Sequence, residues 1–136
     1  MKVALVSLNQ SWENKNENKQ KVEKTLALIT EHCTNTDLVV YPEMTLTGFT
    51  MESQKIKENE LSSETITFFK EQAKKHKLSI AFGVVLSKED KATNNLAVVN
   101  EQGQLLTSYA KIHPISYAVF CLKKTNAIEP LKAIAD

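Results

Sequence analysis

Short apolar runs alternate with an amphipathic stretch along the first part of the chain. Residues 2–8 (KVALVSL) and 37–41 (DLVVY) are β-branched and nearly continuous in apolar character, which is typical of strands buried on both faces. Between them, four residues recur at steps of four, three and four and predict a helix over 17–33: Val22, Leu26, Ile29 and Cys33. Strand, helix and strand in sequence predict a parallel pair with a right-handed crossover.

The rest of the chain predicts one more helix and three further strands. Ser62 or Ser63 can cap a helix with Glu64 in its first turn, and lysines and a histidine end it at KKHK. Strands are expected at 78–86, 95–100 and 104–110. The charged stretch SKEDKAT is expected as a turn, and the second turn contains Gly103 in a left-handed conformation. The order β-α-β-α-β-β-β indicates an α/β fold. Its two helices cover one face of the sheet, which leaves the other face in need of a partner layer.

Composition narrows the classes of function. The 136 residues hold 17 basic and 16 acidic side chains, so a large electrostatic footprint for nucleic acid is not expected. No apolar run approaches the length of a membrane span, and the start MKVALVSLNQ does not resemble a secretion signal. We therefore expect a cytoplasmic domain with no nucleic-acid or membrane partner. The histidines and cysteines lack CxxC or HExxH spacing, and no glycine-rich phosphate loop occurs, so neither a metal nor a cofactor is expected.

Two charged residues stand directly after predicted strands. Glu43 follows Pro42 at the carboxyl end of the second strand, where open α/β sheets bind ligands, although a solvated loop carboxylate has the same pattern. Lys111 follows the last strand and could neutralise an oxyanion, or it could be an ordinary surface lysine. His113 is a weak candidate for a base, and Cys33 is expected in the core because it lies on the apolar helix stripe.

Three segments together resemble the carbon–nitrogen hydrolase (nitrilase) superfamily: VALVSLNQSW, DLVVYPEMTLTGF and YAKIHP. The string PEMTLTGFTME is most similar to the omega-amidase-like branch, which hydrolyses the terminal amide of small oxo-acid amides. The resemblance implies the amino-terminal half of an α-β-β-α sandwich. It also implies a Glu-Lys-Cys mechanism in which Glu43 is the general base and Lys111 stabilises the tetrahedral intermediate. A small amide is the implied substrate, and a homo-oligomer is among the implied states because members commonly pair their sandwiches.

The chain departs from the family pattern after about residue 118. The family's nucleophilic cysteine lies several tens of residues after the lysine, in a setting like Cys-Tyr-Asp or Cys-Tyr-Glu. Here Cys121 comes ten residues after Lys111, in the unmatched context AVFCLKK. We therefore expect a partial hydrolase domain over 1–118 and a divergent tail over 119–136, as a frameshift or early stop would produce.

Three hypotheses remain for the activity. The first is an amino-terminal hydrolase fragment that lacks its nucleophile and is inactive alone. The second is a non-catalytic binding or assembly protein of the same fold. The third is a short hydrolase that uses Cys121. We adopt the first and keep the other two as alternatives. The third would require a different strand geometry, because only ten residues separate Lys111 from Cys121.

Overall fold

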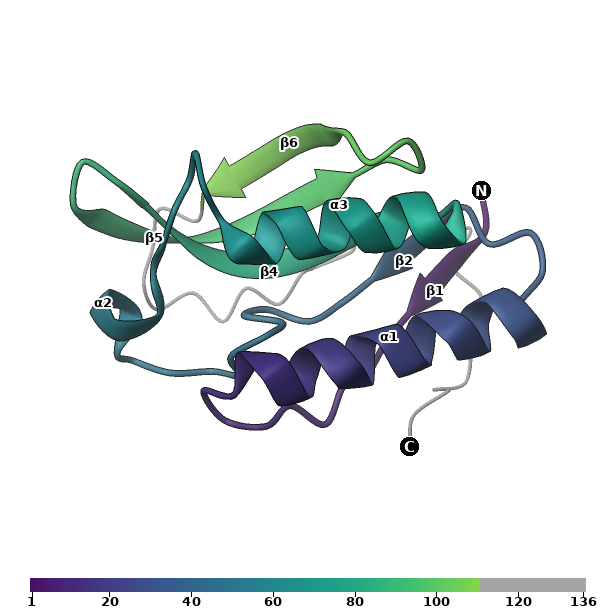
Figure 1. Cartoon of the computed structure of the whole chain (residues 1–136), viewed down its shortest axis with the longest axis horizontal. Helices are drawn as coiled ribbons and strands as arrows, with labels where there is room; N and C mark the ends of the chain where they lie inside the picture. The colour runs from purple at the N-terminus through teal and green to yellow at the C-terminus, as the bar shows by residue number, and fades with distance from the viewer. Residues whose placement is uncertain (111–136) are drawn as a thin grey trace.

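One mixed sheet of six strands organises residues 1–110, the part of the chain that the computed structural model describes (Figure 1). The strands are β1 (Val3–Leu5), β2 (Leu38–Val40), β3 (Glu58–Asn59), β4 (Ser79–Lys88), β5 (Lys91–Val99) and β6 (Leu105–Ala110). They are ordered β1-β2-β4-β5-β6, and β3 pairs with the end of β4. The pairs β1/β2 and β2/β4 are parallel, whereas β4/β5 and β5/β6 are antiparallel. The α/β class and the closing antiparallel meander are thereby confirmed.

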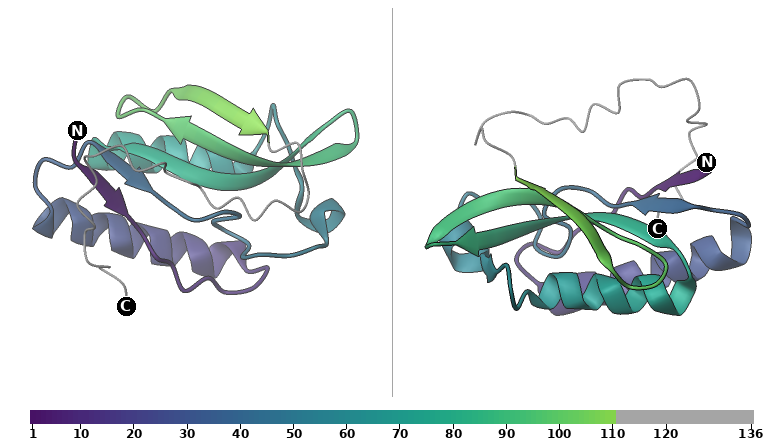
Figure 2. Two further views of the ribbon diagram at one scale, coloured as in Figure 1. Left: turned by 180° about the vertical axis from the view of Figure 1, so that it is seen from behind. Right: turned by 90° about the horizontal axis from the view of Figure 1, so that it is seen from above.

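Two long helices lie against the same face of this sheet, as Figures 1 and 2 show. They are α1 (Lys15–His32) and α3 (Glu64–His76), and a single turn, α2 (Ser53–Ile56), lies between them in the chain. Helix α1 begins two residues before the predicted start because the side chain of Asn14 accepts a hydrogen bond from the Glu17 amide. Helix α3 begins where predicted, and Ser63 is the residue that caps it. No helix in this part of the chain is both long and apolar enough to cross a bilayer.

The core fills the layer between the two helices and the sheet. The predicted stripe of α1 is buried there, with Val22 and Leu26 fully enclosed. Phe69 of α3 stacks on Phe82 of β4 with ring centroids 4.1 Å apart. The ring centroid of Tyr41 lies 5.7 Å from that of Phe69. Cys33 is the C-cap of α1 and is only half-buried; it packs against this cluster, so its expected place in the core is confirmed only in part. Aromatic packing of this kind fixes the position of β4, which supports the candidate site on its other face.

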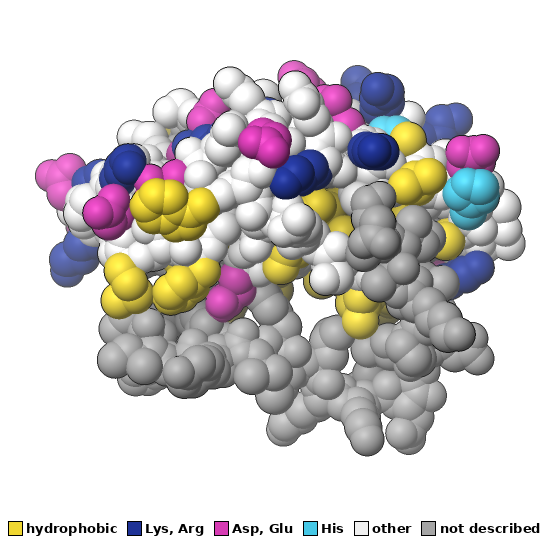
Figure 3. Space-filling model, turned by 90° about the horizontal axis from the view of Figure 1, so that it is seen from below, with side chains coloured by type: hydrophobic (Ala, Val, Ile, Leu, Met, Phe, Trp, Pro, Cys, Tyr) yellow, Lys and Arg dark blue, Asp and Glu magenta, His cyan; other side chains and the backbone are white. Residues whose placement is uncertain are grey.

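The face of the sheet opposite the helices is only partly covered by residues 1–110. Because side chains alternate along a strand, Ala81, Gly83 and Val85 of β4 point to this face. The segment after β2 crosses it, and Met44 and Ile56 from that segment pack on Val85. Strand β6 is exposed along nearly all of its length and carries three exposed large side chains: Leu105, Leu106 and Tyr109. Figure 3 shows further hydrophobic side chains on the surface among charged ones.

The prediction of SKEDKAT as a turn is wrong. Only Glu89 and Asp90 form the turn, with φ values of 50° and 63°, and the flanking lysines Lys88 and Lys91 already pair across the hairpin. Two consecutive left-handed residues match the right-handed twist of the strands, so the ladder continues to the turn itself. Helix α2 and strand β3 were not predicted from the sequence. The turn at Gly103 is confirmed, since its φ is +79°.

Candidate functional site around Glu43

Glu43 lies on a tight turn directly beyond the carboxyl end of β2. The chain leaves β2 while still bonded to β4, because the Tyr41 amide donates to the Ala81 carbonyl over 2.9 Å. The turn then closes on Met44, whose carbonyl accepts from the amides of Thr47 (3.1 Å) and Gly48 (2.9 Å). Met44 has a φ of +46°, an uncommon conformation for a residue other than glycine. The turn therefore holds the half-buried Glu43 in one place on the sheet.

The backbone of this turn packs directly against Gly83 of β4. A Cβ atom added at Gly83 would be 2.4 Å from the Met44 nitrogen and 2.7 Å from the Glu43 Cα, closer than any side chain permits. Two hydrogen bonds join the turn to the same residue. The Thr45 amide donates to the Gly83 carbonyl over 3.1 Å, and the Gly83 amide donates to the Thr45 hydroxyl over 3.0 Å. The absence of a side chain at residue 83 thus lets the backbone of Glu43 rest directly on the strand.

The carboxylate of Glu43 lies beside an amide from the neighbouring strand. Asn94 of β5 pairs with Val85 and therefore points to the same face of the sheet as the turn. Its Nδ2 lies 3.5 Å from Oε1 of Glu43, at the long limit of a hydrogen bond. An amide donor here orients a carboxylate without neutralising it. A carboxylate so held can take a proton from a nearby thiol, as a general base does.

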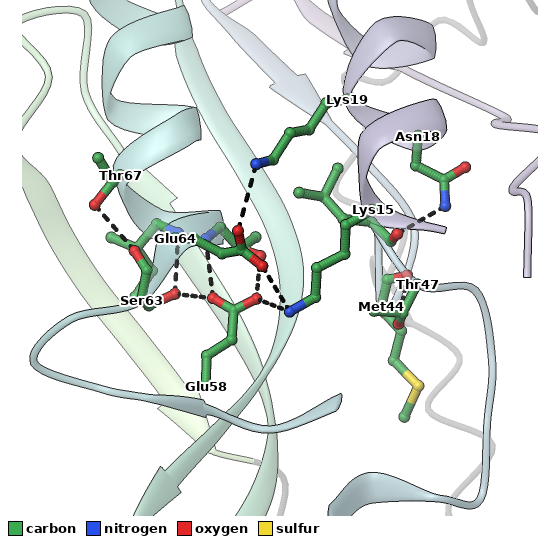
Figure 4. A network of polar contacts seen from close by, with 12 residues as sticks. Lys15, Asn18, Lys19, Met44, Thr47, Glu58, Ser63, Glu64 and Thr67 are labelled. Atoms are coloured by element: carbon green, nitrogen blue, oxygen red, sulfur yellow. Dashed lines mark hydrogen bonds and ion pairs between the residues drawn. The ribbon is translucent and has the colours of Figure 1, made fainter. Parts of the chain in front are cut away.

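A second polar cluster surrounds Glu58, at the start of α3 (Figure 4). Its carboxylate accepts from the hydroxyls of Ser63 and Thr65 and from the Thr65 amide, and it lies 2.9 Å from Nζ of Lys15. Burial opposes ionisation of this group, but the hydrogen bonds outweigh it and hold the pKa of Glu58 below its usual value. Lys15 also contacts Glu64 over 2.9 Å. This cluster ties the N-termini of α1 and α3 together, which is a structural role.

A polar cavity of about 400 Å³ opens next to this cluster. Its walls come from the loop before α1, from α2 and from the first turns of α1 and α3, and they include Glu13, Lys15, Lys55 and Glu64. Glu13 is already bonded to Thr50 and Lys55 within this wall. Glu43 does not line the cavity. Among residues 1–110, no group of three or more histidine, cysteine, aspartate or glutamate side chains could hold a metal ion.

Of the candidates from the sequence, the structure describes Glu43 and Cys33 only. Lys111, His113 and Cys121 lie outside the described residues, so their predicted roles stay predictions. Two contacts of Glu43 were missed. An isolated glycine within a strand is a recognised signal of close backbone approach and could have identified Gly83. Asn94 was placed beside a turn, and its contact with Glu43 could not be recognised without the register of β4 and β5.

Comparison with known proteins identifies the fold and the family. The family model described as carbon-nitrogen hydrolase matches residues 2–132. A curated relative, "Hydrolase in agr operon" of Staphylococcus aureus, is 33% identical over 78 residues, which is 57% of this chain and 30% of that protein. The match of the family model extends past residue 118, and the boundary placed there from the sequence stays a prediction.

Solved structures agree with this assignment. A CN-hydrolase superfamily protein of Xanthomonas campestris, solved with an arsenic adduct in its active site, superposes with a TM-score of 0.72 at 25% identity, over 82% of this chain and 40% of that one. A branch 10 nitrilase-superfamily protein of Saccharomyces cerevisiae gives 0.71 at 26%, over 83% and 44%. An N-terminal amidase at 22% identity and a TM-score of 0.71 shares the fold, over 80% of this chain and 27% of that one. This chain thus spans less than half the length of each of these relatives. The chain belongs to the carbon-nitrogen hydrolase family.

Proposed function

We propose that this chain carries the acid–base part of an amide-hydrolysing site, with Glu43 as the general base. The observation that carries the proposal is the placement of the Glu43 carboxylate. It lies on a turn that rests on Gly83, beyond the end of β2, with Asn94 of β5 beside one oxygen. Ligands of open α/β sheets bind at the carboxyl ends of the strands, and this is such a position.

The second proposed member of the site is Lys111. Strand β6 ends at Ala110, which pairs with Asn95 of β5. The neighbour of Asn95 is Asn94, the residue beside the Glu43 carboxylate. Lys111 follows Ala110 directly in the chain. The last described residue of β6 is thus one register position from the Asn94 contact, which supports a shared site for Glu43 and Lys111.

The proposed chemistry is hydrolysis of a small amide, by an omega-amidase-like reaction on the terminal amide of an oxo acid. Glu43 takes the proton from a cysteine thiol, the thiolate attacks the amide carbon, and the Lys111 ammonium stabilises the oxyanion. Glu43 then returns the proton to the departing ammonia, and water completes the hydrolysis of the thioester.

Within the described residues the one cysteine is Cys33, which packs against the core on the helix side of the sheet. Glu43 lies on the opposite side, over Gly83. We propose that the nucleophile is encoded outside this chain, that the chain alone is inactive, and that the protein is cytoplasmic and able to form homo-oligomers.

An assay of ammonia release from oxo-acid amides tests this function. The coding DNA beyond residue 136 is read in all frames for a Cys-Tyr-Asp or Cys-Tyr-Glu segment, and the protein is extended through it. We expect no turnover by residues 1–136 alone, since loss of the nucleophile costs on the order of 10⁶-fold in another triad enzyme. The extended protein should hydrolyse amides, and Glu43→Gln should lower kcat by about 10²- to 10⁴-fold. Turnover by the short chain that disappears in Cys121→Ala would contradict the proposal.

A further inference from the structure

One side-chain amide contacts three successive backbone carbonyls of the turn that carries Glu43. Nε2 of Gln10, from the loop after β1, lies 3.2 Å from the carbonyl oxygen of Glu43, 2.8 Å from that of Met44 and 3.1 Å from that of Thr45. The Gln10 amide group has two hydrogens, so the three oxygens share them. No other side chain among the described residues donates to more than one of these carbonyls.

The turn needs such a donor because of its own geometry. Met44 is left-handed, and this conformation carries a cost of about 1 kcal/mol or more outside glycine. Three carbonyl dipoles also converge on one point, where their negative ends repel one another. The amides of Thr47 and Gly48 bond only the Met44 oxygen, whereas the Gln10 amide lies within hydrogen-bond distance of all three. Gln10 is half-buried, so water replaces its amide less readily than at an open surface.

We propose that Gln10 is a positioning residue for the general base. Its amide holds the Glu43–Thr45 backbone against Gly83, and the carboxylate of Glu43 thereby stays beside Asn94. The catalytic value of this contact rests on the function proposed above for Glu43. The structural effect of the amide on the turn does not depend on that function.

The isosteric change Gln10→Glu replaces the donor by a carboxylate that faces three carbonyl oxygens. Hydrogen exchange of single amides by NMR reports the turn through Thr45, bonded to Gly83, and Gly48, bonded to Met44. We expect both amides to exchange at least about 10-fold faster than in the wild type. This is the effect expected when one hydrogen bond is lost and a charged acceptor takes the place of the donor. The carboxyl ¹³C signal of Glu43, assigned by its disappearance in Glu43→Gln, should shift as well.

The pH profile separates positioning from general destabilisation. Protonation of the introduced carboxylate in Gln10→Glu restores one donor, so the ratio of variant to wild-type exchange should fall as the pH is lowered. Gln10→Ala, which lacks both donor and charge, should raise exchange of the same two amides with no such pH dependence of the ratio. Gln20→Glu, at an exposed position of α1, is the matched control and should leave both amides within about twofold of the wild type, the range expected of a surface substitution.

Two results would overturn the proposal. One is unchanged exchange at Thr45 and Gly48 in both Gln10 variants. The other is an equal increase across α1 and the β4–β5 ladder, which would indicate a loss of global stability. Amide exchange does not depend on catalysis, so the effect of Gln10 on the turn can be confirmed even if the ammonia assay shows no activity. If the exchange prediction fails, the role of Glu43 as general base is still tested separately by the ammonia assay.

Discussion

The close contact between Gly83 and the Glu43 turn predicts the effect of a single methyl group. In Gly83→Ala the new Cβ would start 2.4 Å from the Met44 nitrogen and 2.8 Å from the Glu43 carbonyl carbon. An ordinary contact begins near 3.4 Å, so the turn or the strand must move by about 1 Å. Overpacking of this kind costs about 1–3 kcal/mol, partly offset by about 0.4–1 kcal/mol from the stiffer unfolded chain. The clashing atoms belong to the backbone, which cannot move aside as a flexible side chain can, so the upper part of this cost applies and the net loss of unfolding free energy should be about 1–2 kcal/mol.

Thermal unfolding followed by circular dichroism measures this loss. The entropy of unfolding is about 2.1 cal/mol/K per residue, taken over 136 residues. Dividing the loss of unfolding free energy by this entropy gives a decrease in Tm of roughly 4–7 °C. Gly103→Ala is the matched control. It introduces the same methyl group at a φ of +79°, in a turn whose Cβ would contact Lys70 of α3 rather than the Glu43 turn.

Both glycine variants should melt earlier, but only Gly83→Ala should accelerate amide exchange at Thr45, because that amide donates to the Gly83 carbonyl. An unchanged Tm together with unchanged Thr45 exchange in Gly83→Ala would refute the reasoning.

Two further predictions concern stability and association. Glu58→Gln should lower the unfolding free energy by about 2 kcal/mol at pH 7, because charge-assisted hydrogen bonds from Lys15, Ser63 and Thr65 are lost. The folded-state pKa of Glu58 is depressed, so its stabilisation is present above the usual glutamate pKa and is lost as the pH falls through the folded value. Urea titrations should therefore show the two proteins converging as the pH falls below the usual glutamate pKa. The chain alone should also associate and bind a hydrophobic dye through the exposed edge strand β6. A monodisperse, dye-free monomer in size-exclusion chromatography would show that the exposed side chains of β6 do not drive association.

The two long helices were predicted from the sequence, because each leaves a local signal: a hydrophobic repeat or a helix cap. The stripe of Val22, Leu26 and Ile29 identified α1, and Ser63 with Glu64 marked the start of α3. Both signals act within one helix, so they are visible without tertiary contacts. By contrast, α2 has four residues and β3 has two, too few to show a period. Strand β3 exists because Glu58 and Asn59 reach Leu86 and Ser87, far along the chain.

The candidate site was predicted only in part. Glu43 was singled out because it follows a strand and a proline. The structure places it on a turn over β4, and its role as general base stays a prediction. Gln10 was not identified, since a polar loop residue has no local pattern and its three partners lie more than thirty positions away. The same holds for Glu58, which reads as a solvated loop acid until Lys15 from α1 is placed beside it. Contacts between distant loops depend on the assembled sheet, and sequence periodicity does not report them.

The shared site proposed for Glu43 and Lys111 is tested most directly by zero-length cross-linking of residues 1–136. A carbodiimide joins a carboxylate to an amine only when the two groups are in contact, and the linked peptides are identified by tandem mass spectrometry. Lys15 with Glu58 or Glu64, each at 2.9 Å, provides the internal positive control. We predict a Glu43–Lys111 link that disappears in Lys111→Arg while the Lys15 links persist. Lys15 links without any Glu43–Lys111 link would contradict the shared site.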